Sequence, residues 1–530
     1  MVLQSAFRRY SPNPISRPNR LNELIAVRAL TSASRSFAED ARSDRRLCFG
    51  DLPQAVRQWS RVLDDLGAPV GSSVGVAIKD PLDFVTAFLG VIGAGRWVAP
   101  IDQSAPDAAI AASCQRLALP LVLASRTAPG GLELNWVPLS EGARGSVRAV
   151  IAERSFPSGR LDLNETASGG VLLSSSGTSG TPKVISLDEA LLLHRAGAIA
   201  SHHEFSASDR GFNPLPLFHI NAEVVGLLSS LVAGSSIVLD DRFHRSGFWE
   251  LIAARAITWI NAVPAIIAHL SDRSPSEEVP AGVRFIRSAS APLPLATHHR
   301  FSRSVGIPIL ETYGMTEAAS QITANPLQGV RKRGSVGTPV EAELRIAPMD
   351  LREEVLDGSG LSRRVGRVEI RGPGVISRYS SPGYEDRFAS DGWLRTGDLG
   401  YLDEDGYLFL VGREDDVINR GGFKVMPRDI EEVILAEPSV KEVAVVARYD
   451  EALGEVPVAF VVLRHDSPEP DELAKAMTAI ERHCAITLAR PSRPAALHVV
   501  KALPTGTNGK LHRRALWQEP VVSLASAALR

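Results

Sequence analysis

The chain has 530 residues, of which 44% are hydrophobic and 22% are charged, a balance typical of soluble globular proteins. Its 58 basic and 60 acidic residues leave a formal net charge of −2, so the strongly basic footprint of a nucleic-acid-binding protein is absent. Cys48, Cys114 and Cys484 lie far apart and form no CxxC pair, which argues against a disulfide framework and a cysteine-based zinc site. At about 100–200 residues per domain, the length predicts three or four packing units.

The first 22 residues contain four arginines and no acidic residue, a composition that transit peptides share. However, Pro12, Pro14 and Pro18 would break the amphipathic helix that such a peptide needs, so a loose N-terminal arm is the favoured interpretation. No stretch reaches the roughly 18 uninterrupted apolar residues of a membrane span. We therefore expect a cytoplasmic protein with no membrane span and no nucleic-acid partner.

In the first part of the chain, short apolar runs alternate with helical patterns. Residues 74–78 and 120–124 are typical of buried strands, and residues 84–94 between them are typical of a buried helix. The alternation resumes after residue 170, with strands predicted at residues 171–173, 236–239, 258–262 and 284–288. Such alternation predicts parallel sheets covered by helices. Its two occurrences predict two stacked α/β layers, at roughly residues 30–170 and 171–333.

The pattern changes between residues 334 and 414, where short strands are separated by turns such as Asp405-Gly406, a strong hairpin signal. This change predicts a small β-barrel or antiparallel sheet. A third pattern follows, with helices and strands predicted at residues 428–436, 442–447, 456–463, 470–483 and 497–500. The predicted fold class is therefore α/β: a large N-terminal domain (1–414) of two sheet layers plus a β-barrel, and a small α+β C-terminal domain (415–530).

The most informative segment runs from Ser174 to Lys183 and reads SSSGTSGTPK. Its small residues allow successive backbone N–H groups to converge on an anion, and Lys183 adds a point charge suited to phosphate. It is not a Walker A loop, because Pro182 precedes the lysine and the glycine-to-lysine spacing differs. A flexible Ser/Gly linker is the alternative. The candidate phosphate-binding residues are Ser175, Ser176, Gly177, Thr178, Ser179, Gly180 and Lys183.

Four further motifs follow along the chain. Glu317, in the run ETYGMTE, offers the hard oxygen ligation that Mg²⁺ prefers. Asp398 stands at a predicted strand end, where a carboxylate can accept hydrogen bonds from ribose hydroxyls. Arg413 closes the predicted β region, and Lys510 stands in a glycine-rich turn, PTGTNGK. Each motif taken alone is explained equally well as a surface turn.

Together and in this order, the motifs resemble the adenylate-forming superfamily of acyl- and aryl-CoA synthetases, peptide-synthetase adenylation domains and firefly luciferase, from about residue 40 to residue 516. The runs PLFH (216–219) and MTEA (315–318) look most like CoA ligases of the 4-coumarate and oxalate type, and residues 321–337 look like the oxalate branch. The resemblance implies an ATP-dependent carboxylic acid:CoA ligase that forms an acyl-adenylate and then an acyl-CoA thioester. It also implies Mg²⁺, coenzyme A and a mobile C-terminal lid.

The same resemblance implies roles for individual residues. Thr316 and Glu317 would hold the α-phosphate and Mg²⁺, and Lys510 would bridge the substrate carboxylate and the α-phosphate. The C-terminal domain would turn at the hinge residue Asp415 and bring Gly421-Gly422 to the pantetheine of CoA. The residues implied for the nucleoside are, for adenine, Ser290, Ala291, Pro292, Tyr313 and Gly314 and, for ribose, Asp398 and Arg413.

The resemblance also implies an acyl pocket lined by His219, Ile220, Asn221 and Gln321, with His219 a catalytic candidate. Amino-acid-activating relatives place Asp where Ile220 stands, and an ammonium unpaired against Ile would be costly, so an α-amino acid is disfavoured. Relatives specific for ortho-hydroxybenzoates place Asn there, so these acids are disfavoured too. The oxalate-like stretch suggests a small dicarboxylate, but only residues 331–333 (RKR) offer cations. We expect an aryl or medium apolar acid.

Two alternatives stay open. The acyl group could pass to a free-standing carrier protein, an amine or another small nucleophile, since only about 20 residues follow Lys510 and no carrier domain is among them. The chain could also be a non-catalytic nucleotide-binding module, although its intact motif residues argue against this. The sequence does not identify the acid, and it is compatible with a monomer or a homodimer.

Overall fold

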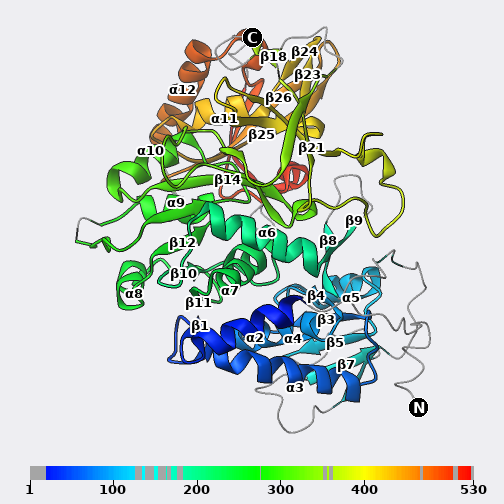
Figure 1. The fold of residues 1–530 in the computed structure, drawn as a ribbon. Helices are drawn as coiled ribbons and strands as arrows, with labels where there is room; N and C mark the ends of the chain where they lie inside the picture. The colour runs from blue at the N-terminus through cyan, green and yellow to red at the C-terminus, as the bar shows by residue number, and fades with distance from the viewer. Residues whose placement is uncertain are drawn as a thin grey trace.

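The structure is a computed structural model. It describes residues 20–530 except for 126–133, 138–147, 153–160, 162, 164–168, 176–182, 275, 350–354, 357–361, 364, 466–468, 505–510 and 527–530. The predicted α/β fold class is confirmed, with a large N-terminal part built on two sheets and a smaller C-terminal part (Figure 1). The boundary between residues 414 and 415 stays a prediction.

A nine-stranded sheet forms the centre of the N-terminal part, in the order β16-β15-β14-β13-β12-β10-β11-β1-β2. The strands from β14 through β1 pair in parallel, whereas β2, β15 and β16 pair antiparallel at the two edges. The strands are β1 (Ser36–Asp40), β2 (Arg46–Cys48), β10 (Arg210–Asn213), β11 (Ser236–Leu239), β12 (Trp259–Ala262), β13 (Phe285–Ser288), β14 (Ile309–Met315), β15 (Ser320–Ala324) and β16 (Thr338–Pro339).

A seven-stranded sheet forms the second layer, in the order β6-β7-β5-β3-β4-β8-β9. Its central strands β5, β3, β4 and β8 pair in parallel, as the βα alternation predicts. The strands are β3 (Ser73–Ala77), β4 (Trp97–Pro100), β5 (Leu121–Ala124), β6 (Leu134–Val137), β7 (Arg148–Ala152), β8 (Gly170–Ser175) and β9 (Lys183–Asp188).

Helices pack between and around these sheets. The helix α4 (Pro81–Gly93) begins where Asp80 accepts hydrogen bonds from the backbone N–H groups of Leu82 and Asp83, and Pro81 fits its first turn. Almost every α4 residue is buried, as expected for a helix that is apolar on all sides. The other helices of this part are α2 (Arg20–Ser32), η1 (Phe49–Asp51), α3 (Leu52–Asp65), α5 (Asp107–Arg116), α6 (Glu189–His202), η2 (Asn221–Leu228), α7 (Ser229–Ala233), α8 (Phe248–Ala254), α9 (Pro264–Ser271), α10 (Leu295–Ser304) and η3 (Thr316–Ala318).

The predicted β region is a four-stranded antiparallel sheet in the order β17-β20-β21-β22. Its β21–β22 turn contains Gly406 with a φ of +78°, the left-handed conformation that the Asp-Gly signal indicates. The elements are β17 (Glu343–Ala347), β20 (Gly366–Arg371), η4 (Glu385–Arg387), β21 (Leu394–Leu402), β22 (Leu408–Arg413) and η5 (Glu414–Asp416), with a separate pair formed by β18 (Val355–Leu356) and β19 (Ser362–Arg363).

The C-terminal part is built on a six-stranded sheet with its own apolar core, which includes Ile430 of α11 and Cys484 of α12. It contacts the N-terminal part where the backbone N–H of Leu295 donates to Glu432 and where Arg428 donates to the Leu410 carbonyl. Its elements are β23 (Ile418–Arg420), β24 (Phe423–Val425), α11 (Pro427–Leu435), β25 (Val440–Asp450), β26 (Gly454–Leu463), α12 (Pro470–Thr487), η6 (Arg490–Ser492), β27 (Ala496–Val500), η7 (Arg513–Gln518) and β28 (Val521–Ser526).

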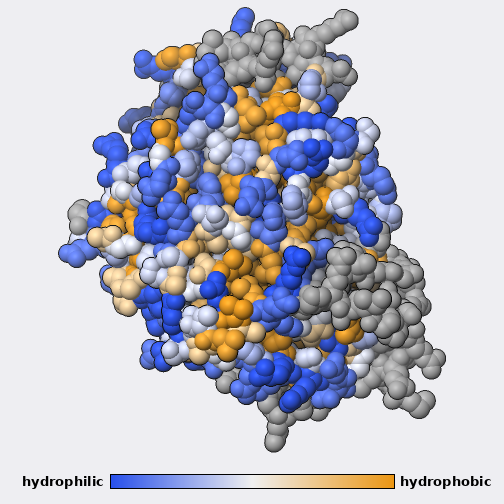
Figure 2. All heavy atoms as spheres, viewed as in Figure 1, coloured by the Kyte–Doolittle hydropathy of each residue, from blue (hydrophilic) through white to orange (hydrophobic). Residues whose placement is uncertain are grey.

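Hydrophilic and hydrophobic residues are mixed on the surface, and on the face in Figure 2 the hydrophobic ones gather mainly towards the middle. Within the described ranges, no helix combines the length and the apolar character that crossing a membrane requires.

Candidate active site

Tyr313, Asp398 and Arg413 meet where β14 approaches the four-stranded sheet. The Tyr313 hydroxyl donates to Asp398 Oδ2 at 2.5 Å, and Arg413 Nη1 donates to Asp398 Oδ1 at 3.1 Å. Asp398 and Arg413 are direct cross-strand partners in the β21–β22 pair, so the strand register sets their approach. Burial and the Asp398 carboxylate raise the pKa of Tyr313, which keeps its phenol a hydrogen-bond donor. Residues from three strands thus form one polar cluster.

Glu317, which lies in η3, is the centre of a second cluster. Its buried carboxylate accepts a hydrogen bond from the Tyr379 hydroxyl at 2.9 Å. Lys183 Nζ lies 5.2 Å from the centre of the Tyr379 ring and 5.4 Å from that of Tyr384. Burial and the Glu317 carboxylate raise the pKa of Tyr379, so its hydroxyl also stays a donor. A hard carboxylate and an ammonium beside each other can hold a metal–phosphate group.

Positive charge gathers around Lys183. Burial lowers the pKa of Lys183, and the charges of Arg387 and Arg413 lower it further, whereas the Glu317 carboxylate acts in the opposite direction. Gly397 joins the two clusters: its φ is +79°, and a Cβ there would lie 3.0 Å from Arg413 Nη2 and 3.4 Å from Arg387 Nη1. Because a bound anion relieves the repulsion between these cations, the arrangement favours a polyphosphate.

The predicted adenine segment follows β13 directly. Ser288 of β13 pairs with Glu311 of β14, and the Thr312 hydroxyl donates to the Ser288 carbonyl at 3.1 Å. Ser290, Ala291 and Pro292 therefore emerge, exposed, beside the strand that carries Tyr313 and Gly314. Both Tyr313 and Gly314 lie in the last part of β14.

Two residues of this region, Ser290 and Gly314, have unusual backbone requirements. Ser290 has a φ of +73°, which is uncommon for a residue with a side chain. A Cβ at Gly314 would lie 1.4 Å from the Ser320 carbonyl oxygen, so only glycine fits there.

The predicted acyl-pocket residues lie around the start of η2, a π-helix that the sequence did not predict. His219 and Ile220 are half-buried just before it, and the His219 carbonyl accepts from the backbone N–H groups of Ala222 and Glu223 at 2.9 and 3.2 Å. Asn221 begins the π-helix and is buried. Helices of this type are found frequently at functional sites, because the wider turn re-aims side chains.

A buried polar network connects this pocket to the sheet. Arg287 of β13 is 1% exposed; its Nη1 donates to Asn221 Oδ1 at 2.9 Å and to Asn261 Oδ1 at 3.1 Å. Its Nε donates to Gln321 Oε1 at 3.2 Å. The Asn221 amide in turn lies 3.3 Å from the Ser290 hydroxyl, in the predicted adenine segment. Asn221 and Gln321, predicted as pocket residues, are therefore brought together by an arginine that the sequence analysis did not single out.

Residues 331–333, the cations that the sequence analysis considered for a second substrate carboxylate, lie away from the predicted acyl pocket. Lys332 forms ion pairs with Asp403 and Asp405, both at 2.5 Å, in the β21–β22 turn. Arg331 and Arg333 line a hollow of about 310 Å³ that also includes Pro308, immediately before β14. That hollow is at the opposite end of β14 from Gly314, so residues 331–333 do not belong to the predicted pocket.

Glu223 is fully buried in η2, and neither of its carboxylate oxygens has a hydrogen-bond partner among the described residues. Burial alone raises the pKa of Glu223 well above its ordinary value, which favours the neutral carboxylic acid.

Several predicted site residues cannot be placed. Residues 176–180 of the serine-rich loop, the side chain of Ser175, and Lys510 lie outside the described residues. Thr316 is half-buried at the start of η3, and the hinge candidate Asp415 lies in η5. The Gly421-Gly422 turn joins β23 to β24, and the backbone N–H of Gly421 donates to the Leu453 carbonyl within the C-terminal part.

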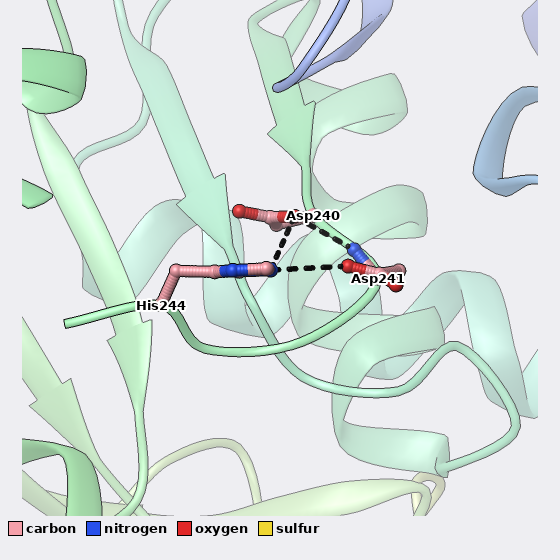
Figure 3. A group of neighbouring side chains, drawn as sticks. All are labelled: Asp240, Asp241 and His244. Atoms are coloured by element: carbon pink, nitrogen blue, oxygen red, sulfur yellow. Dashed lines mark hydrogen bonds and ion pairs between the residues drawn. The ribbon is translucent and has the colours of Figure 1, made fainter. Parts of the chain in front are cut away.

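Asp240, Asp241 and His244, which follow β11, form the one group with metal-ligand spacing in the part of the chain that the structure describes (Figure 3). Arg42 forms an ion pair with Asp240 at 2.5 Å, and His244 Nε2 lies 3.4 Å from Asp241. The arginine already balances the charge of the buried Asp240, so we assign no metal to this group.

Two clusters suited to polyphosphate and ribose, together with the buried polar network around Arg287, fit an adenylate-forming ligase on this fold. The family described as AMP-binding enzyme matches residues 26–380, and the AMP-binding enzyme C-terminal domain matches residues 429–510. The chain belongs to this family of AMP-binding enzymes.

Similar proteins agree with this assignment. A sulfoacetate–CoA ligase of Cupriavidus necator is 34% identical over 93% of this chain and 96% of its own length. An oxalate–CoA ligase of Arabidopsis thaliana is 33% identical over 87% and 91%. The structure of the o-succinylbenzoate CoA synthetase of Bacillus subtilis with its acyl-adenylate intermediate has a TM-score of 0.77 and 25% identity, covering 94% of this chain and 98% of that one. The predicted enzyme class, an AMP-forming acid–thiol ligase that makes an acyl-adenylate and then an acyl-CoA, is confirmed.

Sequence reasoning missed Tyr379, Arg387 and Arg287. Tyr379 and Arg387 stand in a turn-rich stretch with no recognisable pattern. Arg287 could have been noticed in the sequence. It is a charged residue inside the apolar run FIRS, and a charge in a buried strand is unusual and requires a compensating partner.

Proposed function

We propose that this protein joins a small carboxylic acid to coenzyme A at the expense of ATP, with the residues above in defined roles. The observation that carries the proposal is the pair of clusters around Asp398 and Glu317, joined through Gly397. Asp398 and Arg413 bind the ribose, Tyr313 and the segment Ser290-Ala291-Pro292 enclose the adenine, and Lys183 with the serine-rich loop holds the β- and γ-phosphates.

In the first half-reaction, a carboxylate oxygen of the acid attacks the α-phosphorus of ATP, the bond to the β-phosphate oxygen breaks, and pyrophosphate leaves. Two anions must meet, so positioning and positive charge do most of the catalysis and no general base is needed. Lys510 bridges the carboxylate and the α-phosphate, Thr316 holds the α-phosphate, and His219 forms the wall beside the reacting carboxylate.

The residues present fit a magnesium ion. Glu317 is a buried carboxylate beside a cation cluster suited to phosphate, and Mg²⁺ is usually held by one or two carboxylates together with substrate phosphates. When bound, Mg²⁺ neutralises phosphate charge. Tyr379 acts through Glu317, because its hydrogen bond fixes the carboxylate oxygen, and we regard it as a positioning residue.

In the second half-reaction, the CoA sulfur attacks the acyl carbonyl carbon and AMP leaves. The small C-terminal domain (415–530) turns at Asp415 between the two steps, which withdraws Lys510 and brings Gly421-Gly422 to the pantetheine. The glycines are suited to this because a backbone without Cβ atoms can approach a ligand closely.

Support for the class of acid comes from the pocket and from the relatives. The pocket walls include buried amides, and the two curated relatives described above are named for sulfoacetate and oxalate, small acids with a second acidic group. We therefore prefer a small polar acid over the aryl or medium apolar acid that the sequence favoured.

We also propose that the enzyme works in the cytoplasm, as a monomer or a homodimer. Cys48, Cys114 and Cys484 are free thiols in the described structure, which suits a reducing compartment.

The test measures pyrophosphate release from ATP and Mg²⁺ over a panel of carboxylic acids, with and without CoA. We expect release that requires one class of acid and accelerates with CoA, together with an acyl-CoA product by mass spectrometry. Acid-dependent release that ignores CoA would assign the acyl group to a carrier protein or another nucleophile. ATP binding without release for any acid would overturn the proposal in favour of a non-catalytic module.

A further inference from the structure

Arg287 carries a positive charge in the interior of the protein. It is 1% exposed, and burial lowers the pKa of its guanidinium to about 9, which still leaves it charged at neutral pH. Burying a charge is costly unless an opposite charge and hydrogen bonds compensate. No Asp or Glu among the described residues forms an ion pair with Arg287, so hydrogen bonds alone hold it.

The described side chains that accept hydrogen bonds from the guanidinium are all neutral. The amide oxygens of Asn221, Asn261 and Gln321 accept its hydrogen bonds at 2.9, 3.1 and 3.2 Å. His203 is also close, and burial together with the Arg287 charge lowers the pKa of His203 well below its ordinary value, so this ring is neutral as well. The network orients the guanidinium but leaves its charge without a partner.

The other two fully buried arginines are different. Arg96 forms an ion pair with Asp64 at 2.6 Å and donates to the Ala68 carbonyl at 3.0 Å. Arg195 donates to the Val340 carbonyl at 2.7 Å, and the neighbouring Glu341 carboxylate favours its charged form. Among the residues that the structure describes, Arg287 is thus the fully buried arginine that neither forms an ion pair with a carboxylate nor donates a hydrogen bond to a backbone carbonyl.

Arg287 also lies at the predicted acyl pocket. Its partner Asn221 is two residues from His219 and contacts Ser290, and its partner Gln321 is another predicted pocket residue. The hydrogen bonds of Arg287 use Nε and Nη1, and Nη2 has none to a described residue. A guanidinium that amides orient through Nε and Nη1, and whose Nη2 has no hydrogen bond to a described residue, is suited to an anion that accepts in its plane.

We infer that Arg287 is a specificity-determining residue that receives a second acidic group of the substrate, so that the enzyme selects short acids with two anionic groups. This inference rests on the proposed function. A carboxylate and a sulfonate share the required chemistry, since each presents at least two acceptor oxygens to a guanidinium. The buried position of the network also requires a short linker between the two acidic groups.

The test compares acids in pairs that differ only at the second group: malonate with propionate, succinate with butyrate, and sulfoacetate with propionate. Pyrophosphate release gives kcat/KM for each acid. We expect the wild type to prefer the dianion in at least one pair. The substitution Arg287→Gln should reduce that preference about 30-fold or more, because truncating one partner of a buried, hydrogen-bonded charge pair has an effect of that order. Arg287→Lys keeps the charge and should retain part of the preference.

The ratio of kcat/KM within a pair is independent of how much enzyme is folded, so a partly unfolded variant still reports on specificity. Arg195→Gln is the matched control: it removes a buried arginine outside the pocket and should lower the melting temperature without changing the ratio. The malonate and sulfoacetate arms show whether the second group is a carboxylate or a sulfonate.

A wild type that prefers the methyl-terminated acid in every pair, or an Arg287→Gln variant with an unchanged ratio, would overturn the inference while leaving the ligase activity intact. Absence of pyrophosphate release with any acid would instead contradict the proposed function. Calorimetric titration with malonate and with sulfoacetate, without ATP, then decides the inference separately: binding of either dianion that disappears in Arg287→Gln supports it, and no Arg287-dependent binding overturns it.

Discussion

On the proposed nucleotide side of the site, the two acidic residues accept hydrogen bonds from tyrosine hydroxyls or an arginine, whereas on the proposed acyl side one buried arginine is held by neutral amides. Asp398 has both Arg413 and Tyr313, and Glu317 has Tyr379. Among the described residues, Arg287 has Asn221, Asn261 and Gln321 as hydrogen-bond partners and no carboxylate. The first arrangement has its geometry set before any ligand binds. The second contains a buried charge that no described carboxylate balances and that an anionic group of a ligand can balance, a feature that suits a selective pocket.

This difference separates two properties of the enzyme. Residues on the nucleotide side should affect the activation of every acid alike, because each acid reacts with the same ATP. Residues on the acyl side should change the ranking of acids, because only some acids carry a group that matches Arg287.

The largest effect is expected at Lys510, which we propose to bridge the substrate carboxylate and the α-phosphate. Replacing Lys510 with Ala should lower the rate of adenylation by about 10²–10³ for all acids alike, since one preorganised electrostatic contact with the reacting groups is worth that much. The measurement is acid-dependent exchange of pyrophosphate into ATP. Lys501→Ala, an exposed lysine at the end of β27, is the control and should leave the rate unchanged. An undiminished rate in Lys510→Ala would remove this lysine from the mechanism.

A smaller effect, confined to the nucleotide side, is expected for Tyr379→Phe. The hydrogen bond to Glu317 is lost, and bonds to charged groups contribute about 1.5–3 kcal/mol, so activity should fall about tenfold or somewhat more. Because we propose that Tyr379 acts through the magnesium ligand Glu317, the Mg²⁺ concentration for half-maximal activity should rise, and the ranking of acids should not change.

The matched control for this variant is Tyr407→Phe, which removes a tyrosine hydroxyl that donates to the Val330 carbonyl away from both clusters. It should leave the Mg²⁺ dependence at its wild-type value. If Tyr379→Phe lowers activity without moving the Mg²⁺ dependence, its hydroxyl supports the fold rather than Glu317.

The sequence predicted much of the fold and most of the nucleotide side. Buried strands such as 236–239 are visible as short apolar runs, and Asp398 and Lys183 stand in local motifs whose composition reflects their chemistry. Tyr379 and Arg287 were missed because their importance comes from contacts with residues far away in the sequence, which no local pattern encodes. Tyr379 is 62 positions from Glu317, and Arg287 is 66 positions from Asn221. The π-helix at Asn221 was missed for a related reason, since its sequence resembles any apolar helix.

The last expected effect is on stability rather than on activity, and it lies on the acyl side, at Glu223. Its folded-state pKa is raised by burial, so above the ordinary carboxyl pKa of about 4.5 the unfolded chain releases a proton that the folded chain keeps. Stability is therefore lost as pH rises from that ordinary value towards the folded-state value, with a slope of about 1.4 kcal/mol per pH unit for one proton. Glu223→Gln removes this titration, so its melting temperature should exceed that of the wild type by a margin that grows between pH 5 and pH 7.

Thermal unfolding followed by circular dichroism at several pH values measures this margin. Glu250→Gln, which alters an exposed carboxylate on α8, should unfold like the wild type throughout. A margin that stays constant with pH would mean that Glu223 is ionised in the folded protein. It would then need a cation, and Arg287 would be the first one to examine, which would weaken the assignment of its charge to the substrate. A growing margin instead leaves Arg287 as the unbalanced charge at the pocket.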